Sequence, residues 1–203
     1  YEAPIYNALG QINARLENTI AGKRFFDKAR VLEEENTKLQ PLRDTLRQYP
    51  THPQAFYNLA TMYARFNRLR ISAEHFSQAI SLDSTYAPAY LGLGNLLQRL
   101  GSTPEARSEY AKRALAYYLK ALKFDPESAE THNNLGLMLL NSGNTEKALS
   151  HFDQAVSLQP DKGYYIANLG YVQFKLKKFD IAQKNLNKAL QLDSTLYAAH
   201  ETL

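Results

Sequence analysis

A small residue that follows a leucine recurs along this chain at nearly constant intervals. It occurs at Ala60, Gly94, Gly136 and Gly170, so the numbering rises by 34, 42 and 34 from one to the next. A later alanine recurs with steps of 42, 34 and 34, at Ala79, Ala121, Ala155 and Ala189. A period of about 34 residues, with one insertion of eight residues in the second unit, predicts an array of repeated supersecondary units that bury their apolar faces against one another.

The residue types within each unit indicate two packed helices. Gly or Ala at the helix crossing allows close approach, and a bulky residue on the second helix fills the remaining gap. Gly101 and Gly143 fall between the two helices of their units, where a left-handed residue ends a helix at little cost. The residues that fill the gap are Phe76, Tyr118, Phe152 and Leu186.

The third unit carries the whole pattern: Leu135, Gly136, Ala148, Phe152, Ala155 and Pro160, with His132 at the bulky position. This pattern resembles the tetratricopeptide repeat (TPR) family, whose unit is a helix–turn–helix of about 34 residues. The resemblance covers about four units, from residue 53 to about 203. It implies an all-α, right-handed superhelical solenoid of antiparallel helix pairs, in which the first helix of each unit lines a concave groove.

The period divides the chain into segments. We expect an N-terminal helical extension over residues 1–40 and a degenerate half-repeat that caps the array over 41–52. Four TPR units follow over 53–86, 87–128, 129–162 and 163–196, the second of which carries the insertion. Residues 197–203 match the start of a truncated fifth unit. Because the chain begins with Tyr1, we expect a processed or shortened product.

The N-terminal segment carries an apolar stripe with helical spacing, Ile5, Leu9, Ile12 and Leu16. This helix, over residues 5–20, could fold back on the first unit or pair with another copy of the chain. The C-terminal edge at residues 197–203 could likewise continue into more chain or contact a neighbouring molecule. A homo-oligomer through either end is therefore an open alternative.

The sequence contains no residue pattern that indicates an enzyme. The chain has no cysteine, no Gly-rich phosphate loop and no hydrolase or metalloprotease motif. Histidines at equal positions of the repeat, such as His75 and His151, lie in different units and should be too far apart to share a metal. We therefore expect no enzyme, cofactor or metal. The net charge of +4 is scattered, which disfavours nucleic acid, and no apolar run is long enough to span a membrane. Localisation is not determined.

One repeat position on the first helices indicates a binding function. Two residues before the small residue, three of four units carry asparagine, at Asn58, Asn134 and Asn168, and Gly92 interrupts the row. A carboxamide can pair with both the C=O and the N–H of an extended peptide. Alternatively, these asparagines bridge adjacent units. The expected peptide-binding residues are Asn58, Thr61, Arg65, Asn95, Arg99, Asn134, Asn168 and Tyr171.

These features predict a non-enzymatic scaffold that binds a protein or peptide segment in its groove. A self-assembling scaffold and a regulatory TPR array of a larger enzyme are alternatives. The insertion lengthens one helix, over residues 106–126, and lies between Ala106 and Ala121. Both Tyr110 and Tyr118 fit the aromatic address of that helix.

Overall fold

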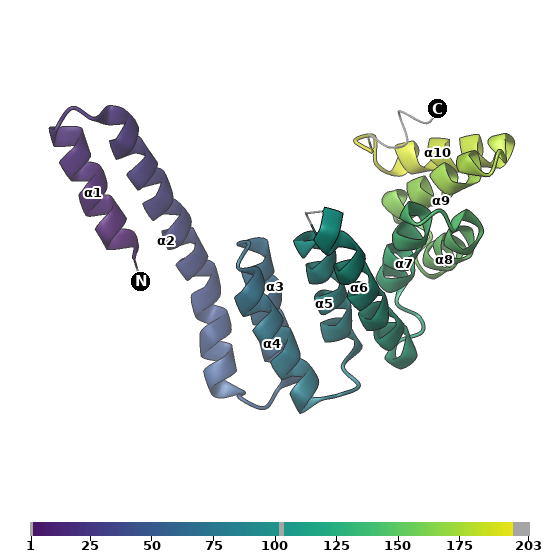
Figure 1. Cartoon of the computed structure of the whole chain (residues 1–203), viewed down its shortest axis with the longest axis horizontal. Coiled ribbons are helices and arrows are strands. Elements are labelled where there is room, and N and C mark those ends of the chain that lie inside the picture. Colours follow the sequence, from purple (N-terminus) through teal and green to yellow (C-terminus); the bar gives the residue numbers. More distant parts are fainter. Residues whose placement is uncertain (1, 102–103, 197–203) are drawn as a thin grey trace. The chain divides into compact units, whose positions relative to one another are not determined.

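The computed structural model describes residues 2–101 and 104–196, with only the helical backbone described for 104–107 (Figure 1). Ten helices and no strand are found in this part of the chain. The chain divides into two compact units, Tyr1–Ser84 and Thr85–Leu203. The expectation of an all-α fold is confirmed.

Consecutive helices form five packed pairs. Short turns join the two members of each pair, so they run antiparallel. The pairs are α1 (Ala3–Arg15) with α2 (Thr19–Gln48), α3 (Pro53–Arg65) with α4 (Leu69–Leu82), α5 (Ala87–Leu100) with α6 (Pro104–Phe124), α7 (Ala129–Asn141) with α8 (Thr145–Leu158), and α9 (Gly163–Lys175) with α10 (Phe179–Leu192). Neighbouring pairs are joined by the contacts α2–α3, α6–α7 and α8–α9.

The crossing of each pair is built on the small residue of its first helix. A Cβ atom added to Gly136 would lie 2.7 Å from Cε1 of Phe152, and one added to Gly94 would collide with the ring of Tyr118. Both rings are fully buried. Glycine is therefore required at these two crossings, because the aromatic ring occupies the space of a side chain.

The turn between the two helices also repeats. The residue seven positions after the small residue has a positive φ in four pairs: 58° at Glu17, 58° at Asn67, 81° at Gly143 and 59° at Lys177. The fifth pair differs. Gly101 has a φ of −73°, so the left-handed conformation expected there is absent. The reason is the insertion in α6, which lengthens that helix at the end nearest this turn.

The structure narrows the position of the insertion. Helix α6 has 21 residues, whereas α4, α8 and α10 each have 14. Tyr118, and not Tyr110, fills the space opposite Gly94, and Ala114 is fully buried beside it. The repeat register therefore holds from Ala114 onward. The extra turns precede Ala114, at the N-terminal end of α6.

Helices α1 and α2 form a pair of the same kind, although the sequence period did not include them. A Cβ atom added to Gly10 would lie 2.7 Å from Cε1 of Phe26, which repeats the contact between Gly136 and Phe152. Helix α2 has 30 residues and passes through Pro41, so the boundary expected after residue 40 falls inside it. Residues 41–48 continue α2 as its last turns and do not form a separate element.

The C-terminal half of α2 packs on α3. Leu39, Leu42 and Leu46 of α2 lie against Leu59 and Tyr63 of α3. This cluster explains why α2 is long. Its N-terminal half pairs with α1. Its C-terminal half covers α3, the first helix of the next pair.

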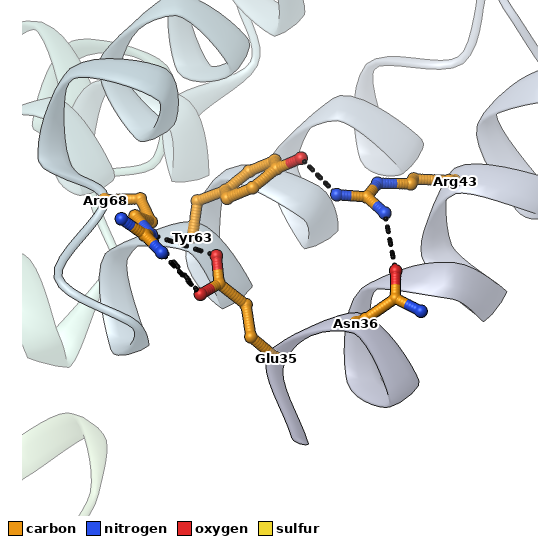
Figure 2. Close-up of polar contacts among 5 residues, drawn as sticks. All are labelled: Glu35, Asn36, Arg43, Tyr63 and Arg68. Carbon is orange, nitrogen blue, oxygen red and sulfur yellow. Dashed lines mark hydrogen bonds and ion pairs between the residues drawn. The ribbon is translucent and has the colours of Figure 1, made fainter. Parts of the chain in front are cut away.

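Polar contacts surround this cluster (Figure 2). Arg68 donates two hydrogen bonds to Glu35, from Nε to Oε1 at 3.0 Å and from Nη2 to Oε2 at 2.9 Å. Arg43 donates to the hydroxyl of Tyr63 at 3.1 Å and to Oδ1 of Asn36 at 3.2 Å. The bond from Arg43 to Tyr63 joins α2 to α3, and the bonds from Arg68 join α2 to the turn between α3 and α4. The expected unit start at residues 197–203 lies outside the described residues.

Candidate functional site

A chain of side-chain amides joins the first helices α5, α7 and α9. Asn168 on α9 donates from Nδ2 to Oδ1 of Asn133 at 2.7 Å. Asn133 donates to Oδ1 of Asn134 at 3.2 Å, and Asn134 donates to Oδ1 of Asn95 on α5 at 2.7 Å. Four carboxamides thus point their donors in one direction across three helix pairs. We call Asn95, Asn133, Asn134 and Asn168 the amide row.

The amide row ends at α5 in a polar cluster of the half-buried Asn95, the buried Tyr118 and the exposed Glu130. The hydroxyl of Tyr118 donates to Oδ1 of Asn95 at 2.8 Å, so this oxygen accepts two hydrogen bonds. Asn95 in turn donates to Oε1 of Glu130 at 3.3 Å. Burial and, to a lesser degree, the nearby charge of Glu130 raise the pKa of Tyr118 well above its ordinary value. Tyr118 therefore remains a neutral donor that orients Asn95 at physiological pH.

Asn95 takes the place of the asparagine that is missing from the second unit, where Gly92 occupies the equivalent position. Gly92 has no side chain to offer, and Asn95, three residues later on the same helix, accepts the hydrogen bond from Asn134. The row is therefore continuous across the second unit. The bridging role, which the sequence left as an alternative, is present in the structure.

The amides keep capacity for a ligand. A carboxamide has two N–H groups. The hydrogen bonds found among the described residues use one of them on Asn134 and one on Asn168. Both side chains are half-buried, whereas Asn133 is only 4% exposed. Asn133 therefore acts as an internal link, and Asn134 and Asn168 present fixed amide groups at the surface.

The other expected binding residues lie outside this row. Oδ1 of Asn58 accepts a hydrogen bond from Gln54 at 2.7 Å, and Thr61 donates to the backbone oxygen of Tyr57. Tyr171 is half-buried, with Nζ of Lys175 5.3 Å from its ring centroid. Arg65 and Arg99 are exposed in the last turns of α3 and α5. Their ligand-binding role remains a prediction.

Two histidines of one unit meet, which the sequence comparison missed. Nδ1 of His132 lies 3.0 Å from Nδ1 of His151, and Nε2 of His132 lies 3.1 Å from the backbone oxygen of Pro126. Burial, followed by the charge of His132, lowers the pKa of His151. The separation of 19 positions could have revealed this contact. In the first unit, Phe56 and His75 have the same separation, and their rings are also in contact.

The inserted turns of α6 border a cavity of about 740 Å³. The apolar part of its described lining comes from Leu97, Tyr110, Ala111 and Met138, and no charged side chain is among the described lining residues. Lys112 and Arg113 are exposed on the same segment.

Within the described residues, no group of three or more His, Cys, Asp or Glu side chains could hold a metal ion. The helices searched there include none with the length and apolarity of a membrane span. The candidate surface is the amide row, carried by three stacked helix pairs; stacked repeats of this kind form extended surfaces that can bind other molecules.

Comparison with known proteins identifies the family. Tetratricopeptide repeat models match residues 85–161 and 164–196. The chain belongs to the tetratricopeptide repeat family.

Curated relatives share this repeat with low identity. The anaphase-promoting complex subunit CDC16 of Saccharomyces cerevisiae is 25% identical over 76% of this chain, which spans 17% of that protein. Tetratricopeptide repeat protein 6 of Homo sapiens is 24% identical over 67% of this chain, which spans 25% of that protein. The chain thus spans a quarter or less of these relatives.

Solved structures share the fold. TTC0263, a thermophilic TPR protein of Thermus thermophilus, superimposes with a TM-score of 0.64 at 20% identity, covering 98% of this chain and 95% of that one. YrrB, described as a TPR protein with an unusual peptide-binding site, superimposes with a TM-score of 0.57 at 19% identity, covering 97% and 89%.

Proposed function

We propose that this chain is a protein-interaction scaffold and that the amide row binds the backbone of an extended polypeptide segment. The observation that carries the proposal is the fixed orientation of Asn134 and Asn168. Their side chains are half-buried and hydrogen-bonded at one N–H group, so little rotational freedom is lost when a ligand binds.

The chemistry of the row matches a peptide backbone. An extended strand presents alternating N–H and C=O groups, and a carboxamide complements both. The surface near the row also carries Tyr171 with Lys175 above its ring, which suits a segment with an apolar or acidic side chain. Because Asn133 and Asn95 are already used within the row, we assign the ligand contacts to Asn134 and Asn168.

The relatives support a scaffold role. CDC16 is a subunit of a multiprotein complex, and YrrB has a peptide-binding site by its description. Several of these proteins are much longer than this chain, so we propose only that the array binds a protein segment.

A peptide library displayed on phage and selected against the immobilised protein tests this proposal. Peptides that bind should lose affinity by roughly fivefold in Asn168→Ala, because one amide contact is worth about 1 kcal/mol. Asn187→Ala, on the exposed face of α10, is the matched control and should leave affinity unchanged. Equal binding by wild type and Asn168→Ala would remove the row from the binding site.

A further inference from the structure

The apolar stripe of α1 remains open in the structure. Ile5, Ile12 and Leu16 are 61%, 52% and 71% exposed, and Leu9 between them is half-buried. The opposite side of α1 packs on α2 through Gly10, which lies against Phe26. The pairing of α1 with α2 therefore leaves a continuous row of aliphatic side chains uncovered, whereas single exposed aliphatic residues are common on protein surfaces.

The residues at equivalent positions of other first helices show how such a stripe is normally covered. The equivalents of Leu9 and Ile12 in α9 are Leu169 and Val172, which are buried against Phe152 of α8. In α7 they are Leu135 and Met138, which pack with Tyr118 of α6.

The same register holds in α3. The equivalents of Leu9, Ile12 and Leu16 there are Leu59, Met62 and Phe66. They pack in the cluster that contains Leu39, Leu42 and Leu46 of α2. At all three junctions a neighbouring helix covers these addresses, so the stripe of α1 is a helix-docking face.

We propose that the occupant of this face is α1 of a second copy of the chain, in an antiparallel dimer. In the second helices, the residues at the position that would cover the stripe, Phe76, Tyr118, Phe152 and Leu186, are buried. Phe26 is 39% exposed, but Lys23 and Arg30 stand one turn to either side of it. Helix α10 exposes Ile181 at another position, so Ile181→Asp below also tests that helix as the occupant. We assign the contact to α1 of the second copy because its own stripe is uncovered and apolar along the same length.

The spacing of the stripe fits two-fold symmetry. Its intervals of four, three and four residues read the same in both directions. When Leu9 faces Ile12 of the second copy, Ile5 faces its Leu16, so every apolar side chain meets another. An isologous interface of this kind closes at two subunits.

Helix dipoles favour the antiparallel direction, because opposed dipoles attract each other. Antiparallel pairing also brings Glu2, exposed at one end of α1, toward the end that carries both Arg15 and Glu17, which are exposed as well. Parallel pairing would instead bring Glu2 to Glu2 and Arg15 to Arg15. Four aliphatic side chains per copy make a small interface, so we expect a dissociation constant on the order of 10 to 100 µM.

The test is light scattering coupled to size exclusion, from about 5 to 500 µM protein, a range that brackets this affinity. The wild-type mass should rise from one chain toward two. Ile12→Asp should weaken the dimer by on the order of 100-fold or more, since each dimer loses two aliphatic contacts and buries two carboxylates. Ile181→Asp on α10 is the matched control, because Ile181 is 54% exposed, and it should dimerise like wild type.

Engineered cysteines test the direction, since the chain has no cysteine of its own. A mixture of Ile5→Cys and Leu16→Cys proteins should form a disulfide-linked dimer. Each variant alone should not, because positions 5 and 16 lie roughly 16 Å apart along the helix and a disulfide needs Cα atoms within about 7 Å.

Three results would overturn the proposal. A constant monomer mass up to the highest concentration would show that α1 of a second copy does not cover the stripe. A dimer weakened equally by Ile12→Asp and Ile181→Asp would place the contact elsewhere. Cross-linking of Ile5→Cys with itself would contradict the antiparallel arrangement. Circular dichroism of each variant shows that a lost dimer is not a lost fold.

Discussion

Asn134 on α7 donates a hydrogen bond of 2.7 Å to Asn95 on α5, although the two residues are 39 positions apart in the sequence. This bond links two helix pairs through polar side chains, next to the apolar contact between α6 and α7. It lies in the middle of the amide row, with Asn133 on one side and Tyr118 on the other. The row is thus both a link within the array and the proposed binding surface.

This dual role predicts unequal effects of two alanine substitutions. Asn134→Ala leaves the donor of Asn133 and one acceptor site of Asn95 without partners, so we expect a loss of about 1–3 kcal/mol in the free energy of unfolding. Asn168→Ala leaves one group, Oδ1 of Asn133, without its donor, and so should cost less than the loss of two partners. Urea denaturation of both variants measures the difference. Equal losses of unfolding free energy would show that Asn134 does not stabilise the row more than Asn168 does.

The crossing of α7 and α8 gives a second prediction. Gly136→Ala places a methyl group against the buried ring of Phe152, so we expect it to lower the free energy of unfolding by about 1 kcal/mol or more. In a Phe152→Ala background the ring is absent, and the same substitution should become neutral or stabilising, because alanine favours a helix by about 1 kcal/mol over glycine. A double-mutant cycle by chemical denaturation measures this reversal. Identical effects in both backgrounds would contradict the crossing.

The register of α6 gives a third prediction. Tyr118 is fully buried opposite Gly94, whereas Tyr110 lies half-buried beside the cavity. We expect Tyr118→Ala to cost about 3–5 kcal/mol and Tyr110→Ala less than about 2 kcal/mol. Thermal and urea unfolding of the two variants decide the matter. A larger loss for Tyr110→Ala would move the insertion to the other side of Ala114.

The fold was largely predictable from the sequence because the repeat is a local pattern. Leucine, glycine and a later aromatic residue at a constant spacing define a helix pair wherever they occur. The α1–α2 pair has these residues too, in Leu9, Gly10 and Phe26. It was missed because α2 has 30 residues whereas the second helix α4 has 14. The longer helix separates Gly10 from Ala60 by more than one period and so hides the repeat.

The site was predictable only in part. The address of Asn134 and Asn168 follows from the period, but Asn133 and Asn95 do not share that address. Their role depends on which way each amide points and on how neighbouring pairs pack. Periodicity carries no information on either. The contact between His132 and His151 was missed for a related reason, because comparison between units does not reveal pairs within one unit.

The two histidines predict a loss of stability in mild acid. The pKa of His151 is lowered below its ordinary value of 6.5, chiefly by burial and further by His132. The unfolded chain therefore takes up a proton on His151 before the folded chain does. Stability from this group is complete above about pH 6.5 and falls as the pH drops through and below that value.

Melting temperatures between about pH 7.5 and 5 measure this effect, since the window spans the ordinary pKa of histidine. We expect the decrease toward pH 5 to become smaller in His151→Gln, which has no titrating group at this position. His75, whose pKa burial also lowers, continues to contribute in that variant. His52→Gln is the control, because His52 is exposed, and it should keep the wild-type decrease. A decrease unchanged by His151→Gln would exclude the pair as its source.

The ion pair between Glu35 on α2 and Arg68, the residue that precedes α4, gives the last prediction (Figure 2). The side chain of Glu35 is only 12% exposed and accepts two parallel hydrogen bonds from Arg68. Glu35→Gln keeps the shape but removes the charge, so we expect a loss of about 1 kcal/mol, the partial exposure of Arg68 limiting the effect. Glu34→Gln, one residue earlier, removes an exposed pair with Lys38 within a single helix and serves as the control. Urea unfolding at low and high salt should show a loss for Glu35→Gln under both conditions and almost none for Glu34→Gln. Equal, salt-sensitive losses of unfolding free energy in Glu35→Gln and Glu34→Gln would contradict the prediction. They would mean that the bond from Glu35 to Arg68 adds no more than an exposed ion pair.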